Sequence, residues 1–174
     1  MNIQLATGDI TDFTGGVIIV PSDSDLTYKK TGILPKLLEK AGKDLIRELT
    51  NIGYIEVGYA AVVQGYELKA KHIIFMPIAD HNNEEVRINY VGLHQSLRAA
   101  FDLANLYKAK SVAIAGIHIS SRRKNFFVSL WDKYFGDNSE TRTLNDSEIE
   151  DIVISTSKNF ESTIKELIIY KYSK

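Results

Sequence analysis

Short apolar runs alternate along the chain with segments in which apolar residues recur every three or four positions. The run over 17–20, Val-Ile-Ile-Val, is β-branched and lies between two glycines and a proline. A strand that is buried on both faces has this composition. Similar apolar or β-rich runs predict further strands over 57–64, 72–77, 111–117 and 152–154.

Helical spacing of apolar residues predicts the helices that connect these strands. This spacing is found over 33–49, 88–107 and 122–135, and again in Phe160, Ile164, Leu167 and Ile168, which predict a final helix. The polar stretch over 136–148 is typical of a long loop. Strands that alternate with helices form a mostly parallel sheet covered on both faces, so the pattern predicts an α/β fold.

Sheets of this kind bind ligands outside the carboxyl ends of their strands. The loops that follow the predicted strands cover residues 21–32, 78–87, 118–122 and 155–159. We therefore expect the ligand-binding residues in these loops.

Composition and charge narrow the class of protein. The 174 residues are 44% hydrophobic and 25% charged, which suits one folded domain over 1–174. The formal net charge of −1 provides no bulk field for an anionic partner, so direct binding to nucleic acid or to an anionic membrane is not expected. An anion site would have to come from local geometry.

Cysteine and histidine usage argues against metal and redox chemistry. The chain has no cysteine, which excludes disulfides and thiolate ligands, and its four histidines lack zinc-ligand spacing. We therefore expect no metal and no cofactor. No apolar run is long enough for a signal peptide or a membrane-spanning helix, so a cytoplasmic protein is expected.

Three segments carry a resemblance to a known family. Residues 8–11 read Gly-Asp-Ile-Thr, residues 57–74 contain Val-Gly-Tyr-Ala and Gly-Tyr-Glu-Leu-Lys-Ala-Lys, and residues 111–117 read Ser-Val-Ala-Ile-Ala-Gly-Ile. In order and spacing they resemble the macro domain family along nearly the whole chain, apart from an enlarged region over 121–148. The resemblance implies a three-layer α/β/α domain with a mixed, mostly parallel sheet and a cleft for ADP-ribose.

The chain departs from the family in its ligand loops. Counted without gaps from Gly8, the family's Asn-Ala-Ala-Asn motif falls on 20–23, which read Val-Pro-Ser-Asp. The loop over 28–33 keeps one glycine of the usual Gly-Gly-Gly-Val, and the second phosphate loop becomes His-Ile-Ser-Ser-Arg over 118–122. Loss of glycine removes backbone positions that can approach a ligand closely. The chain thus resembles the scaffold more than the catalytic form of the family.

Asp9 and the adjacent Ile10 are the first candidate ligand contacts. An aspartate in a turn commonly caps the backbone amides that follow it. The resemblance implies instead that the Asp9 carboxylate accepts a hydrogen bond from an adenine amino group, which a charged acceptor does well. Both interpretations stay open.

Ser22 and Asp23 follow the buried strand at the expected ligand edge. Asp23 is either a turn or capping residue or an acceptor for ribose hydroxyls. It is also the candidate catalytic residue, because a carboxylate with a raised pKa could activate water as a general base. The sequence shows no second acid, and a carboxylate near a diphosphate is repelled unless a cation intervenes.

Lys29 and Lys30 stand where the family has glycines. They are either solvated, or one of them pairs with a phosphate or an ADP-ribosyl linkage, or they block the distal-ribose pocket. Gly32 and Ile33 complete this loop and are expected to contact the ligand.

The basic segment over 120–124 opens a predicted helix directly after a strand. Helix N-termini attract anions, Ser120 or Ser121 is a natural cap, and Arg122 offers a fork that matches phosphate oxygens. The alternative is a solvated basic first turn, although such cations oppose the helix dipole. His118, at the end of the strand, is either a structural histidine or a further contact.

Phe160 begins the predicted final helix, where the resemblance implies an aromatic ring over the adenine base. An ordinary core phenylalanine is the alternative.

These residues favour binding of ADP-ribose or a related adenine nucleotide, free or attached to a macromolecule. One alternative is a hydrolase that removes ADP-ribose from esters or proteins. The other is a degenerate macro scaffold for protein–protein contact, with 121–148 as its surface. The sequence does not decide whether the chain is an enzyme.

Overall fold

The computed structural model describes residues 1–26, 33–79, 90–117, 144, 146–160 and 163–171. They form a six-stranded sheet in the order β1-β6-β5-β2-β4-β3. All neighbouring strands pair in parallel except β3, which is antiparallel to β4. The strands are β1 (Asn2–Ala6), β2 (Val17–Asp23), β3 (Ala61–Gln64), β4 (His72–Ala79), β5 (Ser111–Ala115) and β6 (Glu166–Tyr170).

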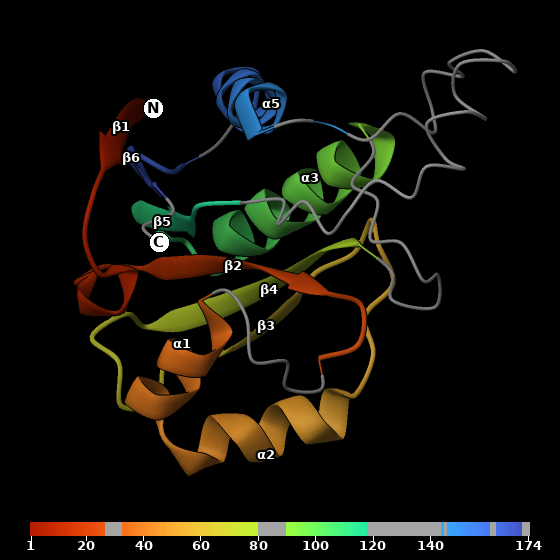
Figure 1. Ribbon diagram of the computed structural model, residues 1–174. Helices are drawn as coiled ribbons and strands as arrows, with labels where there is room; N and C mark the ends of the chain where they lie inside the picture. Colours follow the sequence, from red (N-terminus) through yellow and green to blue (C-terminus); the bar gives the residue numbers. More distant parts are fainter. Residues whose placement is uncertain (27–32, 80–89, 118–143, 145, 161–162, 172–174) are drawn as a thin grey trace, which may run out of the picture.

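Helices cover both faces of this sheet (Figure 1). One layer contains α1 (Leu34–Ala41) and α2 (Lys43–Ile52), and the opposite layer contains α3 (Tyr90–Leu106) and α5 (Asp146–Lys158). A short 3-10 turn, η1 (Ile10–Asp12), connects β1 to β2. The mixed, mostly parallel sheet in three layers that the sequence predicts is therefore confirmed.

The central strand β2 explains why the sheet carries a helical layer on each side. Val17 and Ile19 pack toward α3 and α5, whereas Ile18 and Val20 pack toward α1 and α2, and all four are fully buried. Burying each of these side chains stabilises the fold by about 1.5–3 kcal/mol. A strand with no polar face can sit only inside the molecule, as its uninterrupted apolar run predicts.

The single helix predicted over 33–49 is divided in two at Gly42. This glycine has φ 86°, a left-handed conformation that L residues rarely adopt, and its N–H donates to the Leu38 carbonyl. A Cβ at this position would lie 2.5 Å from Glu67 Oε1. The apolar spacing continues across the break, so the spacing alone does not reveal the C-terminal cap that ends α1.

The last two elements are the reverse of what the sequence pattern predicts. The predicted strand over 152–154 lies inside α5. The residues on either side of it, 146–148 and 155–158, were expected in loops and are also helical. Within α5 the core contacts come from Ile149, Ile152 and Val153, which follow helical spacing. The β-branched run over 152–154 suggested a strand, but the segment is a helix because burying one helical face against the core is more favourable.

The predicted final helix is instead the strand β6. Leu167 and Ile169 pack on the α3 and α5 side of the sheet, whereas Ile168 and Tyr170 pack on the α1 and α2 side. This alternation is the two-residue period of a strand, and β6 pairs with β1 and β5 along its whole length. Phe160 precedes β6 and does not begin a helix.

We expect Gly65→Ala to destabilise the hairpin of β3 and β4 by about 1–3 kcal/mol, because a Cβ there would overlap the Ala70 carbonyl. Gly65 also donates to the Lys71 carbonyl, 2.9 Å away, so the turn cannot open without losing this bond. Denaturant unfolding measures the change. Lys69→Ala, an exposed position in the same turn, is the control, and equal unfolding free energies for the two variants would contradict the prediction.

Candidate functional site

The carboxyl ends of the parallel strands form a stepped edge. Ala6, Tyr170 and Ala115 are paired residues at the ends of β1, β6 and β5. The pairing of β5 with β2 stops at Ile19, whereas β2 continues beside β4 as far as Asp23. At about 3.3 Å per residue, β2 projects well beyond its neighbour β5.

The junction of β2 and β5 is a topological switch point. The chain that leaves β2 enters α1 on one face of the sheet, whereas the chain after β5 leads to α5 on the other face. Open α/β sheets bind their ligands at such points, because the two connections diverge there. The carboxyl edge, where the sequence predicts ligand binding, is therefore also the edge at which this topology favours a ligand.

Asp9 follows the carboxyl end of β1 by three residues and contacts two partners. Its Oδ1 accepts hydrogen bonds from the Thr11 backbone N–H at 3.1 Å and from the Thr11 hydroxyl at 2.7 Å, so that it caps η1. Its Oδ2 lies 2.8 Å from Nζ of Lys36, in α1. Asp9 thus has the capping role, and its second carboxylate oxygen is paired with the ammonium group of Lys36.

The ion pair keeps both groups charged at neutral pH. Burial raises the pKa of Asp9, but the hydrogen bonds from Lys36 and Thr11 outweigh burial and hold that pKa below its ordinary value of 3.8. The hydrogen bond to Asp9 raises the pKa of Lys36. The edge therefore offers a carboxylate for a donor group and, beside it, an ammonium group for an anion.

Tyr170 is an edge residue that the sequence analysis missed. It ends β6 between two alanines, Ala6 and Ala115, and its half-buried side chain packs on the same face as Ile10. Asp9 and its partner Lys36 belong to this face as well. The alternation along β6, ending in an aromatic residue at a strand end, was the signal that could have revealed it.

Phe160 lies elsewhere and is not brought together with Asp9. Its ring contacts Phe101 of α3, with centroids 5.3 Å apart, on the α3 and α5 side of the sheet. From Phe160 the chain runs through Lys165 into the amino end of β6, the opposite end from Tyr170.

The other predicted contacts divide into three groups. Ser22 and Asp23 lie on the projecting end of β2, and Ser22 Oγ is buried without a hydrogen-bond partner among the residues that the structure describes. Ile10 is 2% exposed and belongs to the core, and the half-buried Ile33 precedes α1 and packs on the same cluster. Outside the described residues lie Lys29, Lys30, Gly32, His118, Ser120, Ser121, Arg122 and the predicted helix over 122–135.

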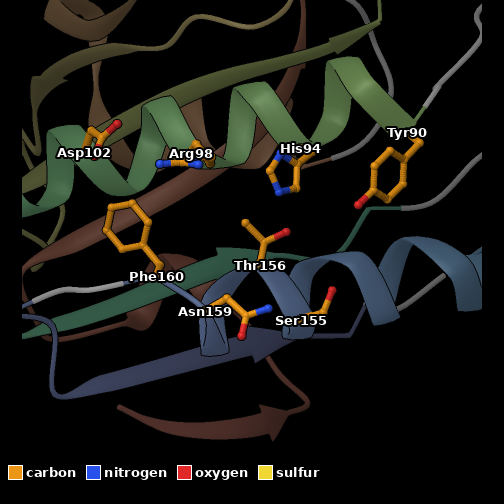
Figure 2. Close-up of a pocket in the computed structure, with 8 residues that line it drawn as sticks. All are labelled: Tyr90, His94, Arg98, Asp102, Ser155, Thr156, Asn159 and Phe160. Carbon is orange, nitrogen blue, oxygen red and sulfur yellow. The ribbon is translucent and has the colours of Figure 1, made fainter. Parts of the chain in front are cut away.

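A cavity of about 400 Å³ lies away from this edge, between α3 and α5 (Figure 2). Its walls include Tyr90, His94 and Arg98 of α3, together with Thr156, Asn159 and Phe160. The sheet separates it from Asp9 and Lys36, which lie on the α1 side. Topology and charge coincide at the strand edge, which favours that edge over the cavity as the site at the switch point of the sheet.

Among the residues that the structure describes, no group of three or more histidine and acidic side chains is placed so that it could hold a metal ion. No helix there is long and apolar enough to span a membrane.

Comparison with known proteins gives the same architecture. A family model described as Macro domain matches residues 21–123, more than half of the chain. A search of curated proteins finds no match.

Several solved structures are similar over nearly the whole chain. The macro domain of ganglioside induced differentiation associated protein 2 is 18% identical, with a TM-score of 0.72, over 98% of this chain and 77% of that one. A Trypanosoma brucei macrodomain in complex with ADP is 14% identical, with a TM-score of 0.72, over 99% and 65%. An Oceanobacillus iheyensis macrodomain with ADP is 19% identical, with a TM-score of 0.68, over 98% and 83%. At these identities the likeness establishes the fold.

We expect Asp9→Asn to destabilise the protein at neutral pH and to have little effect in acid. Asparagine still caps η1, so the variant removes mainly the ion pair with Lys36. Because folding lowers the pKa of Asp9, its charge stabilises the folded state above the ordinary value of 3.8, and this contribution is lost as the pH falls through the lowered pKa.

The measurement is the difference in unfolding free energy between wild type and variant at about pH 7 and at about pH 2. Asp151→Asn, at an exposed position of α5, is the matched control. A difference that stays constant across this range would show that the Asp9 charge contributes nothing.

Proposed function

The chain belongs to the macro domain family, and from this premise we propose that it binds ADP-ribose or a related adenine nucleotide, free or attached to a macromolecule, at the carboxyl edge of its sheet. The observation that carries the proposal is the Asp9 carboxylate, which Thr11 holds in place at the end of β1. It is ionised, faces α1, and stands on the edge where parallel sheets bind nucleotides.

Asp9 and Lys36 match two different parts of such a ligand. The exocyclic amino group of adenine is a donor that a carboxylate accepts, and the diphosphate is an anion that an ammonium group binds. In the free protein the two side chains satisfy each other at 2.8 Å. Binding exchanges these partners: Asp9 Oδ2 takes the adenine amino group, and Lys36 turns toward the phosphates.

Tyr170 provides a surface for the base at the same edge. Its neighbours on β1 and β5 are alanines, so no large side chain stands beside it on the paired strands. Stacking of a planar base on the ring would add about 0.5–1.5 kcal/mol beyond burial, as for other aromatic pairs.

The buried hydroxyl of Ser22 supports a polar ligand next to β2. Its Oγ has no hydrogen-bond partner in the described ranges, and buried polar groups normally have one. A ribose hydroxyl or a phosphate oxygen at the projecting end of β2 would supply it. The similar macrodomains from Trypanosoma brucei and Oceanobacillus iheyensis were solved with ADP, and a variant of the latter with ADPR, which points to the same ligand class.

We expect Asp9→Ala to weaken the binding of ADP-ribose by about 1–3 kcal/mol, the usual value of a hydrogen bond to a charged group. Ribose 5-phosphate, which lacks the base, should bind the variant at least as tightly as the wild type, because Asp9→Ala frees Lys36 for the phosphate. Isothermal titration calorimetry measures both ligands, with Asp151→Ala as the control and thermal denaturation to verify folding. Absence of heat with ADP-ribose and ADP at millimolar concentration would refute the proposal.

Lys36→Met tests the exchange of partners separately. The variant frees Asp9 Oδ2 before binding, so adenosine should bind more tightly to it than to wild type. ADP-ribose should gain less, or lose affinity, because the ammonium group for its phosphates is gone. Titration of both ligands into both proteins gives the ratio, and Arg47→Met on α2 is the control for loss of an exposed cation. Equal changes for the two ligands would contradict the exchange.

A further inference from the structure

The cavity between α3 and α5 has the size of a small-molecule site. Its volume of about 400 Å³ lies within the range of about 300–1,000 Å³ that such sites occupy. Figure 2 shows side chains from both helices directed into the space between them. The cavity lies on the other side of the sheet from Asp9 and Lys36, so a ligand here would be separate from a nucleotide at the strand edge.

Thr156 provides a buried hydroxyl that no residue in the described part of the chain satisfies. The residue is 5% exposed, and its Oγ1 has no hydrogen-bond partner. The residues on either side of it behave differently: Ser155 donates to the Ile152 carbonyl at 3.2 Å, and Ser157 donates to the Val153 carbonyl. Thr156 instead points from α5 toward α3, into the cavity that it lines (Figure 2). A buried hydroxyl without a partner is unfavourable, and a ligand would remove that penalty.

The facing wall on α3 is rich in donors and ring surfaces. Tyr90, His94, Arg98 and Asp102 recur every four residues and therefore share one side of the helix. The rings of Tyr90 and His94 are stacked, with centroids 5.8 Å apart and an interplanar angle of 18°. Arg98 is exposed and forms no ion pair with any residue that the structure describes.

We propose that this cavity binds a small organic anion, a carboxylate attached to a planar apolar body. The carboxylate pairs with the guanidinium group of Arg98 and accepts a hydrogen bond from Thr156, and the apolar body packs between Phe160 and the rings of Tyr90 and His94. Arginine offers the planar fork that matches a carboxylate. A singly charged group suits the cavity better than a dianion, because the carboxylate of Asp102, one helical turn from Arg98, repels a dianion more strongly.

Three probes with one naphthalene body test the proposal: 2-naphthoate, 2-naphthyl phosphate and the uncharged 2-naphthylmethanol. We expect 2-naphthoate to bind most tightly and to shift backbone amide NMR signals over 90–102 and 155–160. Arg98→Met should weaken it about ten- to a hundredfold, the usual effect of losing a charged hydrogen bond. Arg47→Met, on the opposite face of the sheet, should leave it unchanged.

Thr156→Val gives a second readout that a purely structural threonine would not produce. Valine removes the unsatisfied hydroxyl at nearly constant shape, so the melting temperature of the free protein should rise. The affinity for 2-naphthoate should fall about fivefold. Thr50→Val, which removes an exposed hydroxyl that donates to the Ile46 carbonyl on α2, is the matched control.

Several results would overturn the inference. If the backbone amide NMR signals over 90–102 and 155–160 do not shift at millimolar 2-naphthoate, the cavity is not a ligand site. Affinity that is insensitive to Arg98→Met or to Thr156→Val would remove the proposed contacts. Tighter binding of 2-naphthyl phosphate would overturn the preference for a carboxylate, and tighter binding of 2-naphthylmethanol would overturn the requirement for an anion.

Discussion

The burial of β2 on both faces is the constraint on which the rest of the structure depends. Its four apolar residues have no polar side, so a helical layer must cover each face of the sheet. Its parallel pairing with β4 and β5 brings the carboxyl ends of distant segments to one edge. The connections that leave β2 and β5 on opposite faces then create the place where a ligand can approach backbone and side chains together.

The polar chemistry of that edge is organised around one ion pair. Asp9 is held by Thr11 and faces Lys36, so the carboxylate is preorganised before any ligand arrives. In the function that we propose, the same pairing competes with the ligand, because each group must release the other to bind base or phosphate. The proposed site would be selective, because only a ligand that offers both a donor and an anion replaces both groups of the pair.

The two helical layers give the faces of the sheet different properties. On the α1 side, Asp9 and Lys36 satisfy each other. On the opposite side, α3 and α5 leave a cavity in which Thr156 lacks a partner and Arg98 forms no ion pair with the described residues. The buried central strands of the sheet lie between these regions, so a ligand in one region would not contact a ligand in the other.

The sequence by itself determined the central strands and the helix over Tyr90–Leu106, because these depend on local apolar periodicity, whereas Asp9 came only from the family resemblance of Gly-Asp-Ile-Thr. Tertiary structure decided that α5 is a helix and that Tyr170 ends a strand. Short β-branched runs are compatible with either element until burial selects one. It also decided the partner of Asp9, because the contact with Lys36 exists only once α1 packs beside η1.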